Sequence, residues 1–113
     1  MTTRPQHLVT KTSVVLCYDF LRSLHPFKSW NLPKEIDVSV TDKTDEFGSY
    51  TEPNEIAISR LLVWDYQMLI RVVAHEMIHA RQHVLGQDPD HGKSFWVHAR
   101  EVCTAFGWHQ EDI

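Results

Sequence analysis

His75, Glu76 and His79 form the pattern H-E-x-x-H within a chain of 113 residues. On an α-helix, positions four apart differ by only about 40° in azimuth, so the two imidazoles would project from one face and could bind one metal ion. Glu76 follows His75 directly, so its carboxylate would lie to one side of the two histidines, within reach of a water on the metal. Two imidazole ligands and a carboxylate that takes a proton from the water are the parts of a zinc-dependent hydrolase.

The segment that contains this motif is apolar on nearly every side. Between residues 68 and 80 its apolar side chains are Met68, Leu69, Ile70, Val72, Val73, Ala74, Met77, Ile78 and Ala80. A helix of this kind is normally buried. Because a buried, uncompensated carboxylate is strongly destabilising, two histidines and a glutamate on such a helix indicate a metal ion or a polar cleft beside it.

A third metal ligand must come from elsewhere, because a catalytic zinc usually takes three protein ligands and leaves one position for water. His91 is the best candidate, since it follows the motif helix after a short loop and precedes Gly92, which allows close approach of the backbone. Glu101 is the rival, because it lies on the next helix, where thermolysin-like enzymes place a glutamate ligand. The longer metzincin motif is unmet: Gln82 replaces its glycine and Leu85 its third histidine.

Other polar side chains near the motif are candidates for supporting roles. We expect His83 and His98 at the surface, and the alternative for His98 is a position facing the cleft. A ligand imidazole is usually oriented through its free N–H, for which the candidates are Asp88, Asp90 and Glu101. An oxyanion could be stabilised by Tyr50, His98 or Arg100.

The spacing of apolar residues predicts six elements around this site. They are a first helix at 10–24, strands at 36–40, 47–51 and 55–59, the motif helix at about 66–85, and a last helix at 93–106. Asp65 is the predicted N-cap of the motif helix, and Gly86 and Gly107 are predicted to end the last two helices. The chain is therefore expected to have an α+β fold around a small, mostly antiparallel sheet.

Composition is that of a soluble globular domain, with 42% hydrophobic and 23% charged residues, and a chain of this length fits one domain. No apolar run approaches the ~20 residues of a membrane span. The net charge is −4 and Lys and Arg are scattered singly, which argues against a dedicated nucleic-acid surface.

The first twelve residues lack the apolar region of a secretory signal, so we expect an intracellular, cytoplasmic location. Cys17 and Cys103 are too few for a disulfide framework and are interpreted as reduced, packed thiols.

These motifs resemble the SprT-like zinc metallopeptidase domain, in which an H-E-M-x-H-A helix is followed by a loop and an H-G-x-x-F segment. Here the two patterns read H-E-M-I-H-A at 75–80 and H-G-K-S-F at 91–95. The resemblance covers about 10–108 and implies a minimal zincin-like domain: an N-terminal helix, a three-stranded sheet, a metal-binding helix and a closing helix. It implies His75, His79 and His91 as Zn²⁺ ligands and Glu76 as the general base.

Members of that family commonly carry a zinc ribbon or a DNA-binding extension, and the cysteines of a ribbon are missing here. We therefore expect a single domain over 1–113 without a zinc-ribbon extension. The expected activity is that of a zinc metalloendopeptidase, which hydrolyses peptide bonds of protein or peptide substrates with a water activated by Glu76. An extended substrate could pair with a sheet edge, for which the strand at 55–59 is the candidate.

Two alternatives remain open at this stage. One is a zinc-stabilised binding module of the same fold that lacks proteolysis, and the other is a metallohydrolase with a non-peptide substrate. Glu76 argues against the first, since a purely structural zinc site needs no base and usually has its fourth position closed by protein.

Overall fold

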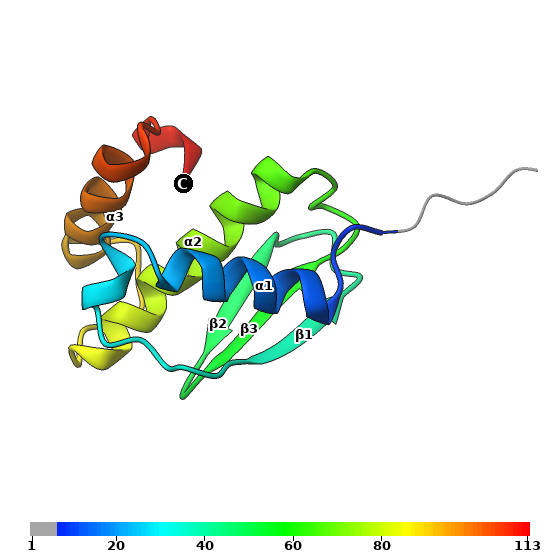
Figure 1. The fold of residues 1–113 in the computed structure, drawn as a ribbon, viewed down its shortest axis with the longest axis horizontal. Helices are drawn as coiled ribbons and strands as arrows, with labels where there is room; N and C mark the ends of the chain where they lie inside the picture. The colour runs from blue at the N-terminus through cyan, green and yellow to red at the C-terminus, as the bar shows by residue number, and fades with distance from the viewer. Residues whose placement is uncertain (1–6) are drawn as a thin grey trace, which may run out of the picture.

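The computed structural model describes residues 7–113, so part of the N-terminal segment that is expected to lack a secretory signal lies outside the described residues. In chain order the elements are α1 (Lys11–Arg22), the 3₁₀ turn η1 (Phe27–Ser29), β1 (Asp37–Thr41), β2 (Gly48–Thr51), β3 (Glu55–Ser59), α2 (Tyr66–Val84), α3 (Lys93–Phe106) and the 3₁₀ turn η2 (Gln110–Asp112). Figure 1 shows α1 and α2 running beside the sheet, with α3 at one end of α2. The predicted α+β fold is confirmed.

Local side-chain chemistry fixes the helix ends. Thr10 and Ser13 bond reciprocally at the start of α1, each side chain accepting from the other's backbone N–H at 3.0 and 2.9 Å. Asp65 caps α2 as predicted, accepting from the backbone N–H of Met68 at 2.7 Å. Gly86 and Gly107 follow the last two helices with φ of +67° and +72°, a backbone region that favours glycine.

The sheet is mixed, with strand order β1-β3-β2. β2 pairs antiparallel with β3 as expected, but β1 pairs with β3 in parallel over five residues. β3 enters between its two predecessors because the chain leaves β1, forms the far strand β2, and then turns back. The prediction that 55–59 offers a free edge is therefore wrong: β3 is paired on both sides, and β2 is the edge strand that contacts α2.

Burial of α2 on several sides explains the apolar composition of the motif segment. Ile56 and Ile58 of β3 are fully buried, as are Val73 and Met77 of α2, and all belong to one core. The same packing buries three polar residues of α2, which are Glu76, His79 and Gln82. Such groups need partners, and these partners define the site described below.

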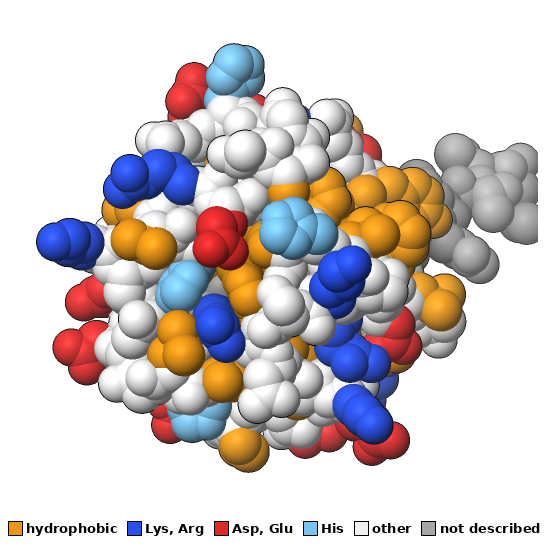
Figure 2. Space-filling model, turned by 60° about the vertical axis from the view of Figure 1, so that its left-hand side comes forward, with side chains coloured by type: hydrophobic (Ala, Val, Ile, Leu, Met, Phe, Trp, Pro, Cys, Tyr) orange, Lys and Arg blue, Asp and Glu red, His pale blue; other side chains and the backbone are white. Residues whose placement is uncertain are grey.

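Two further features concern the surface. On the face displayed in Figure 2, Lys and Arg side chains are dispersed among acidic and apolar ones. No helix within residues 7–113 combines the length and apolarity needed to cross a membrane.

Candidate metal centre

Three imidazoles from two parts of the chain converge on one point. His75 and His79 project from α2, and His91 lies in the turn before α3. The Nε2 atom of His91 is 3.0 Å from that of His75 and 3.2 Å from that of His79. Sequence analysis predicted this trio, and the structure brings its members together.

The geometry of the trio fits a metal ion. With Zn–N bonds of about 2.0–2.1 Å and tetrahedral angles, ligand nitrogens lie about 3.3–3.4 Å apart, close to the two separations observed. A neutral imidazole nitrogen carries either one proton or one lone pair, so His91 Nε2 cannot form a full hydrogen bond with both neighbours. A cation shared by three lone pairs satisfies all three rings, and these residues could hold one.

The surroundings keep the rings of His75 and His79 on α2 uncharged, as metal ligation requires. Burial lowers the pKa of His75 to about 4, with smaller contributions from the charges of His79 and His91. The pKa of His79 is also lowered, mainly by burial and despite a hydrogen bond to Gln82 that acts in the opposite direction. Both rings of α2 are therefore neutral near pH 7.

Phe95 is the surface on which all three imidazoles rest. Its ring centroid lies 4.9 Å from that of His75, 5.3 Å from that of His79 and 4.8 Å from that of His91. The side chain is 1% exposed and belongs to the core, so the site has a rigid apolar floor. The sequence analysis included Phe95 only as the last residue of the H-G-K-S-F pattern and did not predict its contact with the three rings.

Gln82 is the functional candidate that sequence reasoning missed. Its Oε1 lies 2.7 Å from Nδ1 of His79, and its Nε2 donates to the backbone carbonyl of Asp90 at 3.0 Å and to Oγ of Ser94 at 2.9 Å. The available signal was its position: three residues after His79 on a helix, it lies on the same face. A carboxamide that is fully buried there needs hydrogen-bond partners.

Among the described contacts, none of the three carboxylates proposed to orient a ligand imidazole bonds to the histidine trio, and two of them have other partners. Asp90 accepts from the backbone N–H of Gly92 at 3.0 Å, and a Cβ at Gly92 would meet that carboxylate. Glu101 accepts from the indole N–H of Trp30 at 3.3 Å and lies outside the histidine trio, so it does not rival His91 in this structure. Asp88 is exposed, and among the described contacts it has none with the trio.

His98 is buried, contrary to its predicted surface position. It follows Phe95 by three residues and precedes Val102 by four, which places it on the buried face of α3. Its Nε2 is 2.9 Å from Oε1 of Gln87, and its ring packs edge-on against Trp30 with centroids 5.5 Å apart. These contacts hold His98 in the packing of α3, and His98 is not one of the three converging imidazoles.

The remaining candidates lie away from the cluster. His83 is partly exposed, and its Nδ1 is 2.9 Å from a carboxylate oxygen of Glu52. The hydroxyl of Tyr50 donates to the carbonyl of Pro53, and Arg100 donates to the carbonyl of Trp96. Neither Tyr50 nor Arg100 is among the residues that line the cavity described next.

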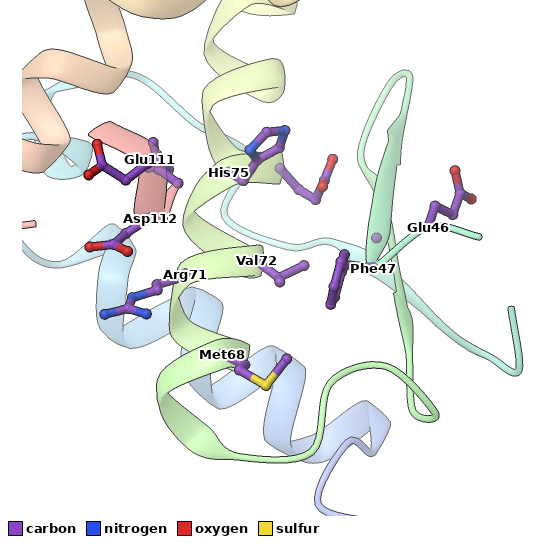
Figure 3. Close-up of a pocket in the computed structure, with 11 residues that line it drawn as sticks. Glu46, Phe47, Met68, Arg71, Val72, His75, Glu111 and Asp112 are labelled. Carbon is purple, nitrogen blue, oxygen red and sulfur yellow. The ribbon is translucent and has the colours of Figure 1, made fainter. Parts of the chain in front are cut away.

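A cavity of about 550 Å³ opens beside His75 and Glu76. Figure 3 shows its labelled residues: Met68, Arg71 and Val72 come from α2 below His75, Phe47 and Glu46 from the segment before β2, and Glu111 and Asp112 from the opposite side. Apolar and charged side chains thus share its walls.

Glu76 lines this cavity although it is only 4% exposed. Burial raises the pKa of its carboxyl to about 8, with a smaller contribution from the negative charge of Glu46. A carboxyl poised near neutral pH can both accept and return a proton, which is the property of a general acid–base group.

Comparisons with known proteins bear on the family and on the fold. The model of the SprT-like family matches residues 18–112. The crystal structure of the metallopeptidase zymogen of Methanocaldococcus jannaschii jannalysin aligns with 77% of this chain and 78% of its own, with a TM-score of 0.55 and 14% sequence identity. Such a likeness shows the fold, which is therefore a metallopeptidase-like α+β fold of the minimal zincin kind. No curated protein sequence matches the chain.

Proposed function

This chain belongs to the SprT-like family, and we propose that it is a zinc-dependent metallopeptidase that cleaves internal peptide bonds of protein substrates. The observation that carries the proposal is the convergence of the Nε2 atoms of His75, His79 and His91 next to a cavity that the Glu76 carboxyl lines. In this proposal the three histidines hold Zn²⁺ and Glu76 is the general base.

Each residue of the trio would contribute one ring nitrogen as a ligand atom. When bound, the ion would act as a Lewis acid that polarises the scissile carbonyl and lowers the pKa of the attacking water. His75 and His79 share one face of a helix, and Phe95 supports all three rings, so little reorganisation is needed to hold the ion.

Glu76 moves the proton. Its carboxylate takes a proton from the attacking water and later delivers it to the leaving amine, so one side chain serves both halves of the reaction. Its burial keeps bulk water from competing for the proton, and its raised pKa matches a group that is protonated and deprotonated within one cycle.

The substrate chain is proposed to lie between α2 and the start of β2. β2 is the edge strand next to α2, so its unpaired backbone groups can bond to an extended peptide by strand addition. Phe47 and Val72 supply apolar contacts in the same cavity, and Arg71 is the cation among its lining residues. Backbone pairing reads sequence weakly, so unfolded segments of many proteins would qualify.

The test compares wild type with Glu76→Gln on an unfolded protein substrate, with zinc content measured in parallel. The proposal predicts that the variant retains zinc and loses at least about 100-fold in kcat/KM, since general acid–base catalysis typically contributes 10²–10⁴-fold. Cleavage is followed by mass spectrometry, which identifies internal peptide bonds.

Glu35→Gln is the matched control, because Glu35 is an exposed glutamate that is not among the residues lining the cavity. It should retain activity. If zinc-loaded wild type cleaves no unfolded protein while binding it, the chain is a zinc-stabilised binding module. Hydrolysis confined to non-peptide esters or amides would assign it to another class of metallohydrolase.

A further inference from the structure

Gln82 links His79 to the turn that carries His91 through one buried carboxamide. It is 0% exposed, and its two ends face different parts of the site. The oxygen meets the ring of His79, and the nitrogen meets the backbone of Asp90, the residue before His91, and the hydroxyl of Ser94.

The orientation of the carboxamide follows from its neighbours. The carbonyl oxygen of Asp90 can only accept a hydrogen bond, so the group that faces it at 3.0 Å must be the amide NH₂ of Gln82. The amide oxygen of Gln82 must then face His79, where it also can only accept.

That orientation selects one tautomer of His79. Because Oε1 of Gln82 accepts, the proton of the neutral imidazole must reside on Nδ1, at 2.7 Å from this oxygen. Nε2 is left with a lone pair, and Nε2 is the atom that lies 3.2 Å from His91. Without Gln82 the ring could carry its proton on Nε2, and that proton would block ligation.

The other end of the amide holds the turn that carries His91. Asp90 is anchored through its carbonyl by Gln82, and its side chain accepts from the backbone N–H of Gly92. His91 stands between these two anchored positions, and its ring reaches α2 only while the turn stays in place.

We propose that Gln82 is a positioning residue for the metal site, which fixes His79 as the Nδ1–H tautomer and ties the His91 turn to α2. The inference rests on the proposed metal site and is independent of whether the substrate is a peptide. Gln82 touches neither substrate nor reacting atoms; it acts through the two histidines.

The first experiment uses wild type without metal. Long-range ¹H–¹⁵N NMR of the imidazole nitrogens, assigned with His79→Gln, reports which nitrogen of His79 carries the proton above pH 7. The inference predicts the Nδ1–H form. A ring found mainly as Nε2–H would overturn it, and this readout needs no variant of Gln82.

The second experiment compares Gln82→Met, which keeps the length of the side chain and removes both polar ends, with wild type. Zinc affinity is measured by competition with a chromophoric chelator, and the visible spectrum of the Co²⁺-loaded protein reports ligand geometry. We expect about 10–100-fold weaker zinc binding, the usual cost of losing a group that orients a metal ligand, together with a changed Co²⁺ spectrum. Affinity within twofold of wild type with an unchanged spectrum would overturn the inference.

Two companion variants separate positioning from folding. Gln87→Met removes another Gln–His contact, the 2.9 Å contact with His98 outside the trio, and should leave zinc affinity and the Co²⁺ spectrum unchanged. Gln82→Glu keeps an oxygen toward His79 but loses the donor to Asp90, so it should retain the Nδ1–H tautomer and bind zinc with intermediate affinity. If Gln82→Met does not fold, the tautomer in wild type and the affinity of Gln82→Glu decide the question.

The experiments distinguish a failure of the proposed function from a failure of the positioning role of Gln82. If wild type binds no zinc, the proposed metal site fails, and the tautomer measurement still reports on the link between Gln82 and His79. If zinc binds and Gln82→Met weakens it but no peptide is cleaved, the positioning role stands and the peptidase proposal falls.

Discussion

The Nε2 atoms of His75 and His91 lie 3.0 Å apart, although the two histidines are 16 positions apart in the chain. The helix turn sets the distance between His75 and His79, but only the packing of α3 against α2 brings His91 to them. The third nitrogen of the site therefore depends on tertiary structure.

This dependence gives a prediction about metal content. His91→Ala should lower zinc affinity by at least about 100-fold, since losing a ligand should exceed the about 10–100-fold cost of losing a group that orients one. Glu101→Ala should leave affinity nearly unchanged, because Glu101 bonds to Trp30 outside the trio. Inductively coupled plasma mass spectrometry after dialysis against a weak chelator measures both, and the reverse ranking would exclude His91 as the ligand.

Phe95 gives a prediction that separates packing from ligation. Phe95→Leu should lower the free energy of unfolding by about 1–3 kcal/mol and also weaken zinc binding, because all three imidazoles rest on this ring. Phe106→Leu is the matched control on the same helix: its ring stacks with Phe27 and Trp108, away from the histidines. Urea titration of the metal-free proteins and chelator competition should show both variants destabilised but only Phe95→Leu impaired in zinc binding.

Much of this site could be predicted from the sequence because its central part is local. His75, Glu76 and His79 lie within one helical turn or so, where the regular geometry of the helix places the side chains. The partners of Gln82 lie 8 and 12 residues further on, and no periodicity reports that a turn will fold back to meet it. Its burial could have been predicted from its spacing from His79.

The pairing of the strands could not be predicted for the same reason, because it depends on contacts between distant parts of the chain. Alternation of apolar residues identified the strands, since it depends on neighbouring positions within each one. The parallel pairing of β1 with β3 depends on which strand enters last, and alternation within a strand does not encode that order. The sequence therefore assigns a free edge to β3, whereas the edge strands are β1 and β2, and β2 is the one that contacts α2. This difference changes the proposed place of the substrate.

Gly48 gives a third prediction, because it brings β2 close to both β3 and α2. A Cβ at this position would lie 2.9 Å from the carbonyl oxygen of Ala57 and 3.0 Å from Cγ1 of Val72. The carbonyl belongs to β3 and cannot move without disturbing the sheet. Gly48→Ala should therefore destabilise the fold by about 1–3 kcal/mol. Ser49→Ala, at the next position of the strand, should be nearly neutral by thermal unfolding; equal effects would show that this contact is unimportant.

Glu76 should reduce the stability of the metal-free protein, and the effect should depend on pH. Its pKa is about 8 in the folded protein, whereas the ordinary value of a glutamate carboxyl is 4.5, so between these pH values the folded state binds more protons than the unfolded state. By linkage, wild type then loses stability as pH rises through this window. Glu76→Gln has no such proton to lose, so its free energy of unfolding should exceed that of wild type. The difference should be small below pH 4.5, grow toward pH 8 and then level off.

Above pH 8 the difference in free energy of unfolding between Glu76→Gln and wild type should be on the order of a few kcal/mol, since each unit of pKa shift corresponds to about 1.4 kcal/mol. Urea unfolding at pH 5, 6.5 and 8 in the presence of a chelator measures it, and the titration of His75, common to both proteins, largely cancels in the difference. Glu111→Gln, at an exposed position on the same cavity, should show no comparable growth with pH. A difference between Glu76→Gln and wild type that stays constant over this range would mean that the carboxyl of Glu76 ionises as freely in the folded protein as in the unfolded chain.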